Sequence, residues 1–400
     1  MTSPLDNILV IDLSRALAGP QAGMMLGDQG ARVIKVESPE GDETRKWGPP
    51  FVGPEGEVST YYLSANRNKE SITLDLKSED GKAVLTELVR RGDVLIENFR
   101  PGVLDRLGFD IDTLHSINPG LVVLSISGFG HDGPEGGRPG YDQIAQGEAG
   151  LMSLTGSGPD DPQRVGVPIA DLLSGMNGAF GVVTALYERE RTGKGRHVRT
   201  SLLASVVGVH ALQGTAYTVA GKVGRAQGNH HPAIAPYGLF TTGDGQVQIS
   251  VANEKLWAAF TTAFGIDPNT EGFTTNPDRV ANRDRLIEVV NAAFADYTSE
   301  QVLTKLSEAG IPAGKVRTLD EVYQWDQVAS QHLLYEVDHP ILGKTTLPGS
   351  ALRYDDNPYS GGREKPLSPP LLGEHNDSVR AWLAADGAQI NTGEGKDETP

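Results

Sequence analysis

The chain contains no cysteine among its 400 residues. Disulfides, thiolate nucleophiles and cysteine-based metal sites are therefore excluded, and the absence is compatible with a reducing compartment. Basic residues are also few, because 35 Lys and Arg stand against 52 Asp and Glu and leave a formal net charge of −17. A chain this acidic is not expected to bind nucleic acid or an anionic membrane surface.

Several other signals are missing. No run of about 18 apolar residues is apparent, so no membrane span is expected. The first residues, Met-Thr-Ser-Pro-Leu-Asp, lack the basic region and apolar core of a signal peptide, and a cytoplasmic location is the default expectation. The nine His residues show no HExxH or similar metal-ligand spacing. There is no Gly-x-Ser-x-Gly elbow either, so a serine hydrolase is not predicted.

The first third of the chain alternates between strand-like and helical segments. Apolar runs predict strands over residues 8–13, 31–37, 71–76, 94–98 and 121–127, with helices over 21–30 and 80–91 between them. This alternation is typical of βαβ units and predicts an α/β fold with a parallel sheet. The turn after the first strand, Ser14-Arg-Ala-Leu-Ala-Gly-Pro20, lacks the G-x-G-x-x-G fingerprint, so nicotinamide or flavin binding is not predicted.

Later residues show longer helices and then a region of mixed character. Helices are predicted over 171–191, 197–221, 253–264, 279–297 and 299–309, a hairpin over 237–242 and 246–251, and strands within 335–353. We expect a large domain over residues 1–224, a smaller α+β domain over 225–320, and a return to the large domain over 321–388. Residues 389–400, rich in Gly and charged side chains, are expected to be a disordered tail.

The most informative segment leads from Val165 through Asp171 into a helix of small residues. Gly175, Gly178 and Gly181 share one face of this helix, and each costs roughly 0.5–1 kcal/mol relative to Ala. They predict close approach by another backbone or by a ligand. Asp171 falls at the expected N-cap position, so its carboxylate is either a helix cap or, in a poorly solvated pocket, a nucleophile. Apolar residues recur at helical spacing from there on: Leu172, Met176, Ala179, Phe180, Val183 and Leu186.

Five basic residues lie near the predicted strand ends: Arg15, Lys35, Lys77, Arg106 and Arg138. Each alone is most simply a solvated surface charge, whereas together they could form a phosphate-binding patch on an acidic protein. No P-loop or magnesium-binding pattern accompanies them, so ATP chemistry is not predicted. His230 and His231 precede Pro232 in a connection, where they are either an ordinary loop pair or the rim of a pocket.

Short motifs also occur in a characteristic order along nearly the whole chain. They are Val10–Pro20, Gly30–Glu37, Asn66–Lys69, Glu97–Gly102, Asp171 with its helix, Arg191–Gly195, Gly310–Gly314 and Pro370–His375. In this order they resemble the class III CoA-transferases, a family that includes formyl-CoA transferase, carnitine CoA-transferase and the α-methylacyl-CoA racemases. Each motif alone is weak evidence for the family, but the complete set in this order is specific.

The resemblance implies a Rossmann-like large domain built from both chain ends, and an interlocked homodimer. It implies that Asp171 attacks an acyl-CoA thioester, that an aspartyl-CoA thioester follows, and that an acceptor acid reverses the steps. Coenzyme A enters as part of the substrate, and no metal or redox cofactor is needed. Backbone N–H groups near Ala18 and the Asp171 turn would stabilise the oxyanion. By motif position, the CoA contacts are Arg15, Ala16, Leu74, Lys77, Asn98, Phe99, Arg106 and Arg138.

Two regions distinguish the chain from other branches of the family. Racemases carry a His where this chain has Tyr141, so Tyr141 joins Asp171 and Ala18 as a catalytic candidate, and α-proton exchange has only Asp171 as a base. The formyl-CoA and oxalate branch carries a Gln where this chain has Leu17, which argues against oxalate. The chain looks most like transferases of dicarboxylates such as succinate or glutarate. An acyl-CoA racemase and a non-catalytic CoA-binding homologue are the alternatives. The substrate pocket is expected to include Leu17, His230, His231 and Tyr237.

Overall fold

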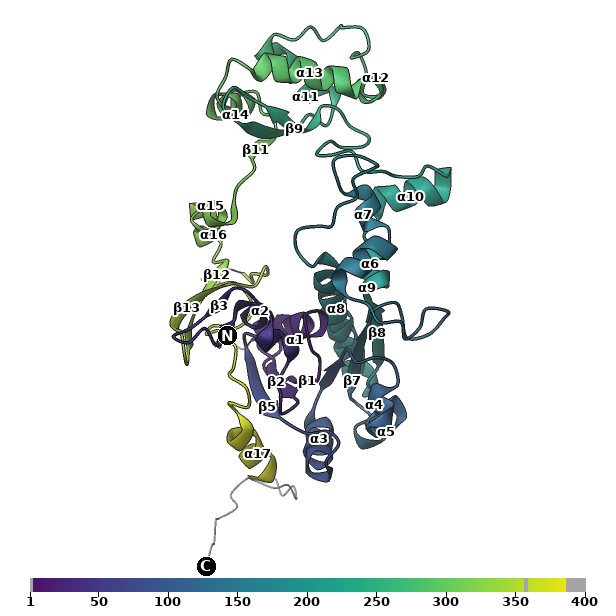
Figure 1. The fold of residues 1–400 in the computed structure, drawn as a ribbon, viewed down its shortest axis with the longest axis vertical. Helices are drawn as coiled ribbons and strands as arrows, with labels where there is room; N and C mark the ends of the chain where they lie inside the picture. Colours follow the sequence, from purple (N-terminus) through teal and green to yellow (C-terminus); the bar gives the residue numbers. More distant parts are fainter. Residues whose placement is uncertain (1–2, 356–358, 386–400) are drawn as a thin grey trace, which may run out of the picture. The chain divides into compact units, whose positions relative to one another are not determined.

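Six strands form one parallel sheet in the first of two units (Figure 1). The computed structural model describes residues 3–355 and 359–385 of the chain. The sheet strands are β1 (Leu9–Asp12), β2 (Arg32–Glu37), β5 (Lys69–Thr73), β6 (Val94–Glu97), β7 (Val122–Ser127) and β8 (His197–Ser201). Their spatial order is β5-β2-β1-β6-β7-β8, which reverses between β1 and β6 as in doubly wound nucleotide-binding sheets. The predicted α/β fold with a parallel sheet is confirmed.

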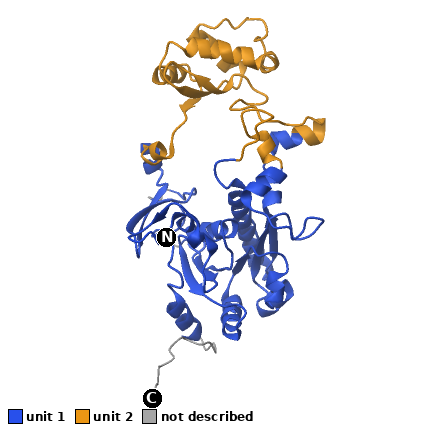
Figure 2. Cartoon of the chain, viewed as in Figure 1, with its two compact units in different colours: residues 1–149, 165–215, 326–400 blue, residues 150–164, 216–325 orange. Residues whose placement is uncertain are grey.

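The chain divides into two compact units, which Figure 2 colours separately. The first contains residues 1–149, 165–215 and 326–400, and the second contains residues 150–164 and 216–325. These breaks lie near the expected domain borders at residues 224 and 320, although residues 150–164 group with the second unit. The division into domains remains a prediction, and the expected tail at 389–400 lies outside the described residues.

Helices cover both faces of the parallel sheet. Those of the first unit are α1 (Ala18–Asp28), the 3-10 helix η1 (Glu43–Lys46), α2 (Thr60–Ala65), α3 (Glu79–Arg91), α4 (Val103–Arg106), α5 (Ile111–Ile117), α6 (Asp142–Glu148), α8 (Ile169–Thr192), α9 (Leu202–Gly208), α16 (Asp326–Ser330) and α17 (Asn376–Ala385). Two antiparallel pairs lie apart from this sheet: β3 (Phe51–Val52) with β4 (Val58–Ser59), and β12 (Leu334–His339) with β13 (Gly343–Pro348). The second pair confirms the strands predicted within 335–353.

One face of the sheet packs against α3, α5 and α17. Successive side chains of a strand point to opposite faces, so Ile11 of β1 and Leu95 of β6 enter the core on this side. Val379 and Leu383 of α17 belong to the same core. Segments from both ends of the described chain therefore build the first unit.

The glycine face of α8 allows this helix to approach α1 and the other face of the sheet closely. A Cβ atom at Gly175 would lie 2.7 Å from the Ala18 carbonyl oxygen, and one at Gly178 would lie 2.8 Å from a methyl group of Leu124. Gly181 is similarly close to β8. These distances are too short for a normal carbon contact, so the packing depends on the absence of side chains here. The close approach predicted for this glycine face is thus made by backbone and core side chains of the same chain.

The opposite face of α8 is apolar and exposed. Met176, Phe180 and Tyr187 are 50%, 75% and 67% exposed, so the apolar spacing around Met176 and Phe180 does not mark the core of this chain. By length and composition, α8 qualifies as a candidate membrane span, and so does the bent pair of α9 with α10 (Ala211–Ala220). One or two helices of this kind are weak evidence for a span, so the expectation of no membrane span stays a prediction. In its most apolar stretch, 44% of the helix is buried, and core helices pass the same test.

The helix predicted over 197–221 is wrong in its first five residues. They form β8, an edge strand that pairs in parallel with β7, and α9 and α10 follow it. The segment His-Val-Arg-Thr-Ser contains β-branched residues that suit a strand. Its pairing partner lies far earlier in the chain, so the local apolar spacing favoured a continuous helix.

The second unit has its own antiparallel sheet and core. Its elements are α7 (Leu151–Leu154), β9 (Tyr237–Thr241), β10 (Gln246–Ser250), α11 (Glu254–Phe264), α12 (Asn276–Ala281), α13 (Arg283–Phe294), α14 (Ser299–Glu308), β11 (Ala313–Lys315) and α15 (Leu319–Tyr323). The predicted hairpin is confirmed as β9 and β10, and β11 adds a third strand. The helix predicted over 279–297 is two helices, α12 and α13, which meet at Asn282. Phe240, Trp257 and Phe260 are buried in the core.

Replacing Gly175 with Ala should destabilise the protein, because the new Cβ would press on the Ala18 carbonyl. We expect the free energy of unfolding in urea to fall by about 1–3 kcal/mol. Gly208→Ala at the end of α9 is the matched control, since no atom lies within 4 Å of its added Cβ. The control should be neutral or slightly stabilising. Equal stability of the two variants would contradict the close packing of α8 on α1.

Candidate active site

One cluster of predicted residues lies at the carboxyl ends of β1 and β6, where the strand order reverses. Ligands of doubly wound sheets bind at such a reversal. The Asn98 side chain accepts a hydrogen bond from the Arg15 N–H at 2.8 Å and donates one to the Arg15 carbonyl at 2.7 Å. The Arg15 guanidinium lies over the Phe99 ring, 5.1 Å from its centroid. The structure thus brings together three predicted CoA contacts from two strand ends.

Other predicted CoA contacts follow neighbouring strands. Ala16 has a φ of +62°, in the left-handed region that residues other than glycine rarely adopt. Leu74 and Lys77 follow β5; Leu74 is buried in the core against which Phe99 packs, whereas Lys77 is exposed. Arg106 is the last residue of α4 and is also exposed. Lys77 and Arg106 are therefore available to a phosphate, while Leu74 can offer only apolar contact.

Two of the basic candidates already have partners. The Arg138 guanidinium pairs with Glu148 at 2.7 Å and with Glu135 at 3.3 Å, and it lies over the Phe129 ring. A phosphate at Arg138 would have to compete with both carboxylates. Lys35 is fully buried in an ion pair, so its expected place in an exposed phosphate patch is wrong.

Asp171 lies in the first turn of α8 but does not cap it. The helix begins at Ile169 after Pro168, so Asp171 is its third residue and the predicted N-cap position is wrong. The cap comes from Asp142 at the start of α6. Its Oδ1 accepts hydrogen bonds from the Ala170 N–H at 2.8 Å and from the Asp171 N–H at 3.4 Å. Because this cap is supplied from a separate helix, no local pattern could show it, and the Asp171 carboxylate is not needed for capping.

The Asp171 carboxyl group is partly buried and has a negatively charged neighbour. Burial, followed by the charge of Asp142, raises its pKa to about 7. Tyr61 of α2 is within electrostatic range of the same site, since burial together with the charges of Asp171 and Asp142 raises the pKa of its phenol to about 12. A carboxyl group that titrates near neutral pH is typical of reactive sites. Sequence reasoning missed Tyr61 and Asp142, although Asp142 directly follows the catalytic candidate Tyr141.

Ala18 and Tyr141 approach this region from two further helices. Ala18 begins α1, and its carbonyl lies against Gly175, one helical turn beyond Asp171. The N–H groups in the first turn of a helix have no intrahelical acceptor, so the start of α1 can donate to a ligand. Tyr141 immediately precedes α6 and is 59% exposed, next to Asp142 in the chain.

The predicted substrate-pocket residues fall in different units. Leu17 is buried immediately before α1 in the first unit. In the second unit, His231 stacks on Tyr237 with ring centroids 5.0 Å apart, and His230 lies edge-on to Phe240 at 5.4 Å. His230 also lines a cavity of about 900 Å³ inside the second unit, which none of the catalytic or CoA-binding candidates lines. The grouping of Leu17 with the residues of the second unit remains a prediction.

The sequence and the fold are both similar to known proteins. Residues 5–376 match CoA-transferase family III. The chain belongs to this family. It is 39% identical over 379 residues to succinyl-CoA:glutarate CoA-transferase of Mus musculus, which covers 94% of this chain and 85% of that protein. It is 38% identical over 395 residues to acetyl-CoA:oxalate CoA-transferase of Acetobacter aceti, with 96% and 97% covered. The crystal structure of a CaiB/BaiF family protein from Brucella suis aligns with a TM-score of 0.84 at 39% identity, over 96% and 100% of the two chains.

The predicted family resemblance is confirmed, and the chain is a CoA-transferase whose substrates include a CoA thioester. Within residues 3–355 and 359–385, no group of three or more His, Asp or Glu side chains is arranged to hold a metal ion. The oxalate and glutarate relatives are almost equally similar to this chain, and the expectation that Leu17 argues against oxalate stays a prediction.

The raised pKa of Asp171 predicts a pH-dependent stability change. The folded state holds this proton up to about pH 7, whereas an unfolded Asp releases it near pH 4, so ionisation of Asp171 destabilises the fold as pH rises between these values. Asp171→Asn removes the effect. At each pH, the unfolding free energy of the wild type is subtracted from that of Asp171→Asn. This difference should be up to about 3 kcal/mol more positive at pH 8 than at pH 5. Urea unfolding at both pH values, at a fixed protein concentration, measures this difference. A variant that is less stable than the wild type at pH 8 would show that the carboxylate has a structural partner.

Proposed function

We propose that this CoA-transferase moves CoA between an acyl-CoA and a free dicarboxylic acid, with Asp171 as the covalent nucleophile. The observation that carries the proposal is the setting of the Asp171 carboxyl group, which is partly buried, has a pKa of about 7, and leaves the capping of α8 to Asp142. Once ionised, such a carboxylate is more basic than an ordinary aspartate and is poorly solvated, which favours attack on a carbonyl carbon.

The proposed exchange proceeds in balanced steps. An Asp171 oxygen attacks the thioester carbonyl, the carbon–sulfur bond breaks, and a mixed anhydride and CoA thiolate result. The thiolate attacks the aspartyl carbonyl of the anhydride, releasing the donor acid and leaving an aspartyl-CoA thioester. The acceptor carboxylate displaces the thiolate from Asp171, and the thiolate then takes the new acyl group and frees the carboxylate. No net proton is gained or lost, so the cycle needs no external acid or base.

Neighbouring helices support these steps. The N–H groups at the start of α1, beginning with Ala18, could stabilise the oxyanion that forms at each attacked carbonyl. Tyr61 is within electrostatic range of Asp171, and its high pKa keeps its phenol protonated and neutral beside the carboxylate. Arg15, Asn98 and Phe99 at the strand reversal would receive the CoA moiety, with Lys77 and Arg106 as exposed cations for its phosphates.

The names of the relatives support a dicarboxylate as the acceptor. Succinyl-CoA, glutarate and oxalate appear in the names of relatives that match over nearly the whole of this chain. We therefore propose that dicarboxylic acids are used in preference to monocarboxylic acids. A glutarate-like and an oxalate-like acceptor both fit these relatives.

The exposed apolar side chains of α8, α9 and α10 support the proposed homodimer. Within the first unit they include Met176, Phe180, Val207 and Leu212. Large apolar patches of this kind mark interaction surfaces, and a second copy of the chain is the partner we propose for this one. The interlocked arrangement and the cytoplasmic location belong to the same proposal.

Asp171→Asn should abolish CoA transfer while leaving the protein folded. We expect the rate to fall by at least about a thousandfold, as for loss of other covalent nucleophiles. Peptide mass spectrometry after mixing wild-type enzyme with succinyl-CoA should find CoA attached to Asp171, and Asp171→Asn should show no adduct. Asp112→Asn in the first turn of α5 is the matched control, since it makes the same chemical change at an exposed helix start. An active Asp171→Asn enzyme would remove Asp171 from the mechanism.

An acceptor screen tests the substrate class. With succinyl-CoA as donor, we expect kcat/KM for glutarate or oxalate to exceed that for acetate or butyrate by at least about tenfold, which corresponds to one specific polar contact. Equal use of monocarboxylates would refute the dicarboxylate proposal without affecting the role of Asp171. Deuterium exchange at the α-carbon of an acyl-CoA, with no acceptor acid present, would instead indicate a racemase.

A further inference from the structure

Four buried charged residues hold the segment that leads from β1 to α1, and we call them the lysine–aspartate cradle: Asp12, Lys35, Asp42 and Lys69. None of the four is more than 1% exposed. Asp12 and Lys69 lie beside α1, because a Cβ at Gly23 would be 2.9 Å from the Asp12 carboxylate and 3.5 Å from the Lys69 ammonium. The mechanism above does not use them.

The Lys35–Asp42 pair holds both sides of the bend at Arg15. The Lys35 ammonium donates to the Ser14 carbonyl and to the Asp42 carboxylate, both at 2.9 Å. The other Asp42 oxygen accepts from the Ala16 N–H at 3.3 Å. The peptide groups before and after Arg15 are therefore fixed by one buried ion pair.

The Asp12–Lys69 pair holds the flanks of the same bend. An Asp12 oxygen accepts from the Ser14 N–H at 3.0 Å. The Lys69 ammonium donates to the other Asp12 oxygen and to the Pro20 carbonyl in the first turn of α1, both at 2.8 Å, and to the Asn66 side chain at 3.0 Å. All three donors of Lys69 are thus used, one of them on the helix whose start carries Ala18.

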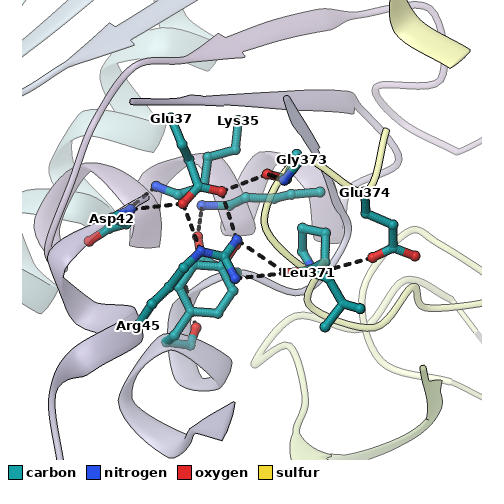
Figure 3. Close-up of polar contacts among 12 residues, drawn as sticks. Lys35, Glu37, Asp42, Arg45, Leu371, Gly373 and Glu374 are labelled. Carbon is teal, nitrogen blue, oxygen red and sulfur yellow. Dashed lines mark hydrogen bonds and ion pairs between the residues drawn. The ribbon is translucent and has the colours of Figure 1, made fainter. Parts of the chain in front are cut away.

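The cradle is itself anchored to the C-terminal part of the unit, as Figure 3 shows. The Asp42 N–H donates to a Glu37 carboxylate oxygen at 2.9 Å, and the Arg45 guanidinium donates to both oxygens of Glu37, at 2.7 and 2.8 Å. Arg45 also reaches the Pro370 carbonyl at 3.2 Å. The Asp42 backbone is therefore fixed by Glu37 and Arg45, independently of its contacts with the bend at Arg15.

We infer that the lysine–aspartate cradle positions the Ser14–Leu17 bend to receive the CoA thioester. Stability alone is a poor account of it, because replacing buried ion pairs with apolar residues of similar size is often neutral or stabilising. The cradle instead holds an irregular segment in which Ala16 adopts a left-handed conformation that costs of order 1 kcal/mol or more. The bend presents Arg15 on one side and the start of α1 on the other.

This inference rests on the proposed CoA contact of Arg15 and Ala16, and it predicts a binding defect when the cradle is removed. The double variant Lys35→Met with Asp42→Asn keeps an acceptor for the Ala16 N–H and leaves no unpaired buried charge. We expect its KM for succinyl-CoA and its calorimetric Kd for CoA to rise about tenfold, as for loss of charge-assisted hydrogen bonds. The KM for the acceptor acid should change less than about twofold, because the peptide groups that this pair holds flank Arg15, a proposed CoA contact, whereas the substrate-pocket candidate Leu17 lies beyond them.

The matched control is the buried pair of Arg67 with Asp28 at the far end of α1. Its side chains are 6% and 2% exposed, and Arg67 also donates to the Pro348 carbonyl. Arg67→Met with Asp28→Asn should lower the Tm without changing the Kd for CoA. The inference is overturned if the folded cradle variant binds CoA normally, or if the control weakens CoA binding equally at the same loss of Tm. The calorimetric measurement does not depend on Asp171, so it separates failure of this inference from failure of the covalent mechanism.

Discussion

The contact of Gly175 with the Ala18 carbonyl is the constraint on which the rest of the site depends. It sets the distance between α8, which carries Asp171 in its first turn, and the start of α1, which carries free N–H donors. Any side chain at Gly175 would push the two helices apart. A nucleophile and the groups that would stabilise its oxyanion must lie close together with little freedom, and a contact between two helices provides this more rigidly than a loop can.

Burial would raise the pKa of the Asp12, Asp42 and Asp171 carboxyl groups alike, but their pKa values are shifted in opposite directions. Asp12 and Asp42 are buried, which alone would raise their pKa values, but the neighbouring lysines lower them below the ordinary value. No cation of the described residues lowers the pKa of Asp171, which its burial and the charge of Asp142 raise. The paired carboxylates are thereby kept as permanent anions that hold the backbone in place. The unpaired one keeps its basicity and remains available for chemistry.

The sequence predicts the central strands to within one or two residues, because strands covered on both faces form short continuous apolar runs. It also predicts the β9–β10 hairpin from Gly243-Asp-Gly245. Features that depend on distant partners are missed. The strand at β8 requires pairing with β7, and the cap of α8 comes from Asp142 on another helix. The same limit applies to Lys35, which looks like a surface phosphate ligand in the sequence and is a buried ion-pair partner in the fold. The family motifs indicate Asp171 and the CoA-binding segment, but Tyr61 joins the site only through folding.

The contribution of the C-terminal segment to the first unit has a consequence for synthesis of the chain. Arg45 and Arg67 donate to carbonyls at Pro370 and Pro348, and α17 completes the core beneath the parallel sheet. The second unit, by contrast, is complete once residue 325 has been made. On the ribosome the later-starting unit can therefore finish folding first, while the core of the parallel sheet stays incomplete until residues 376–385 have been made. Until then, the apolar side chains that pack against α17 in the finished unit lack part of their cover.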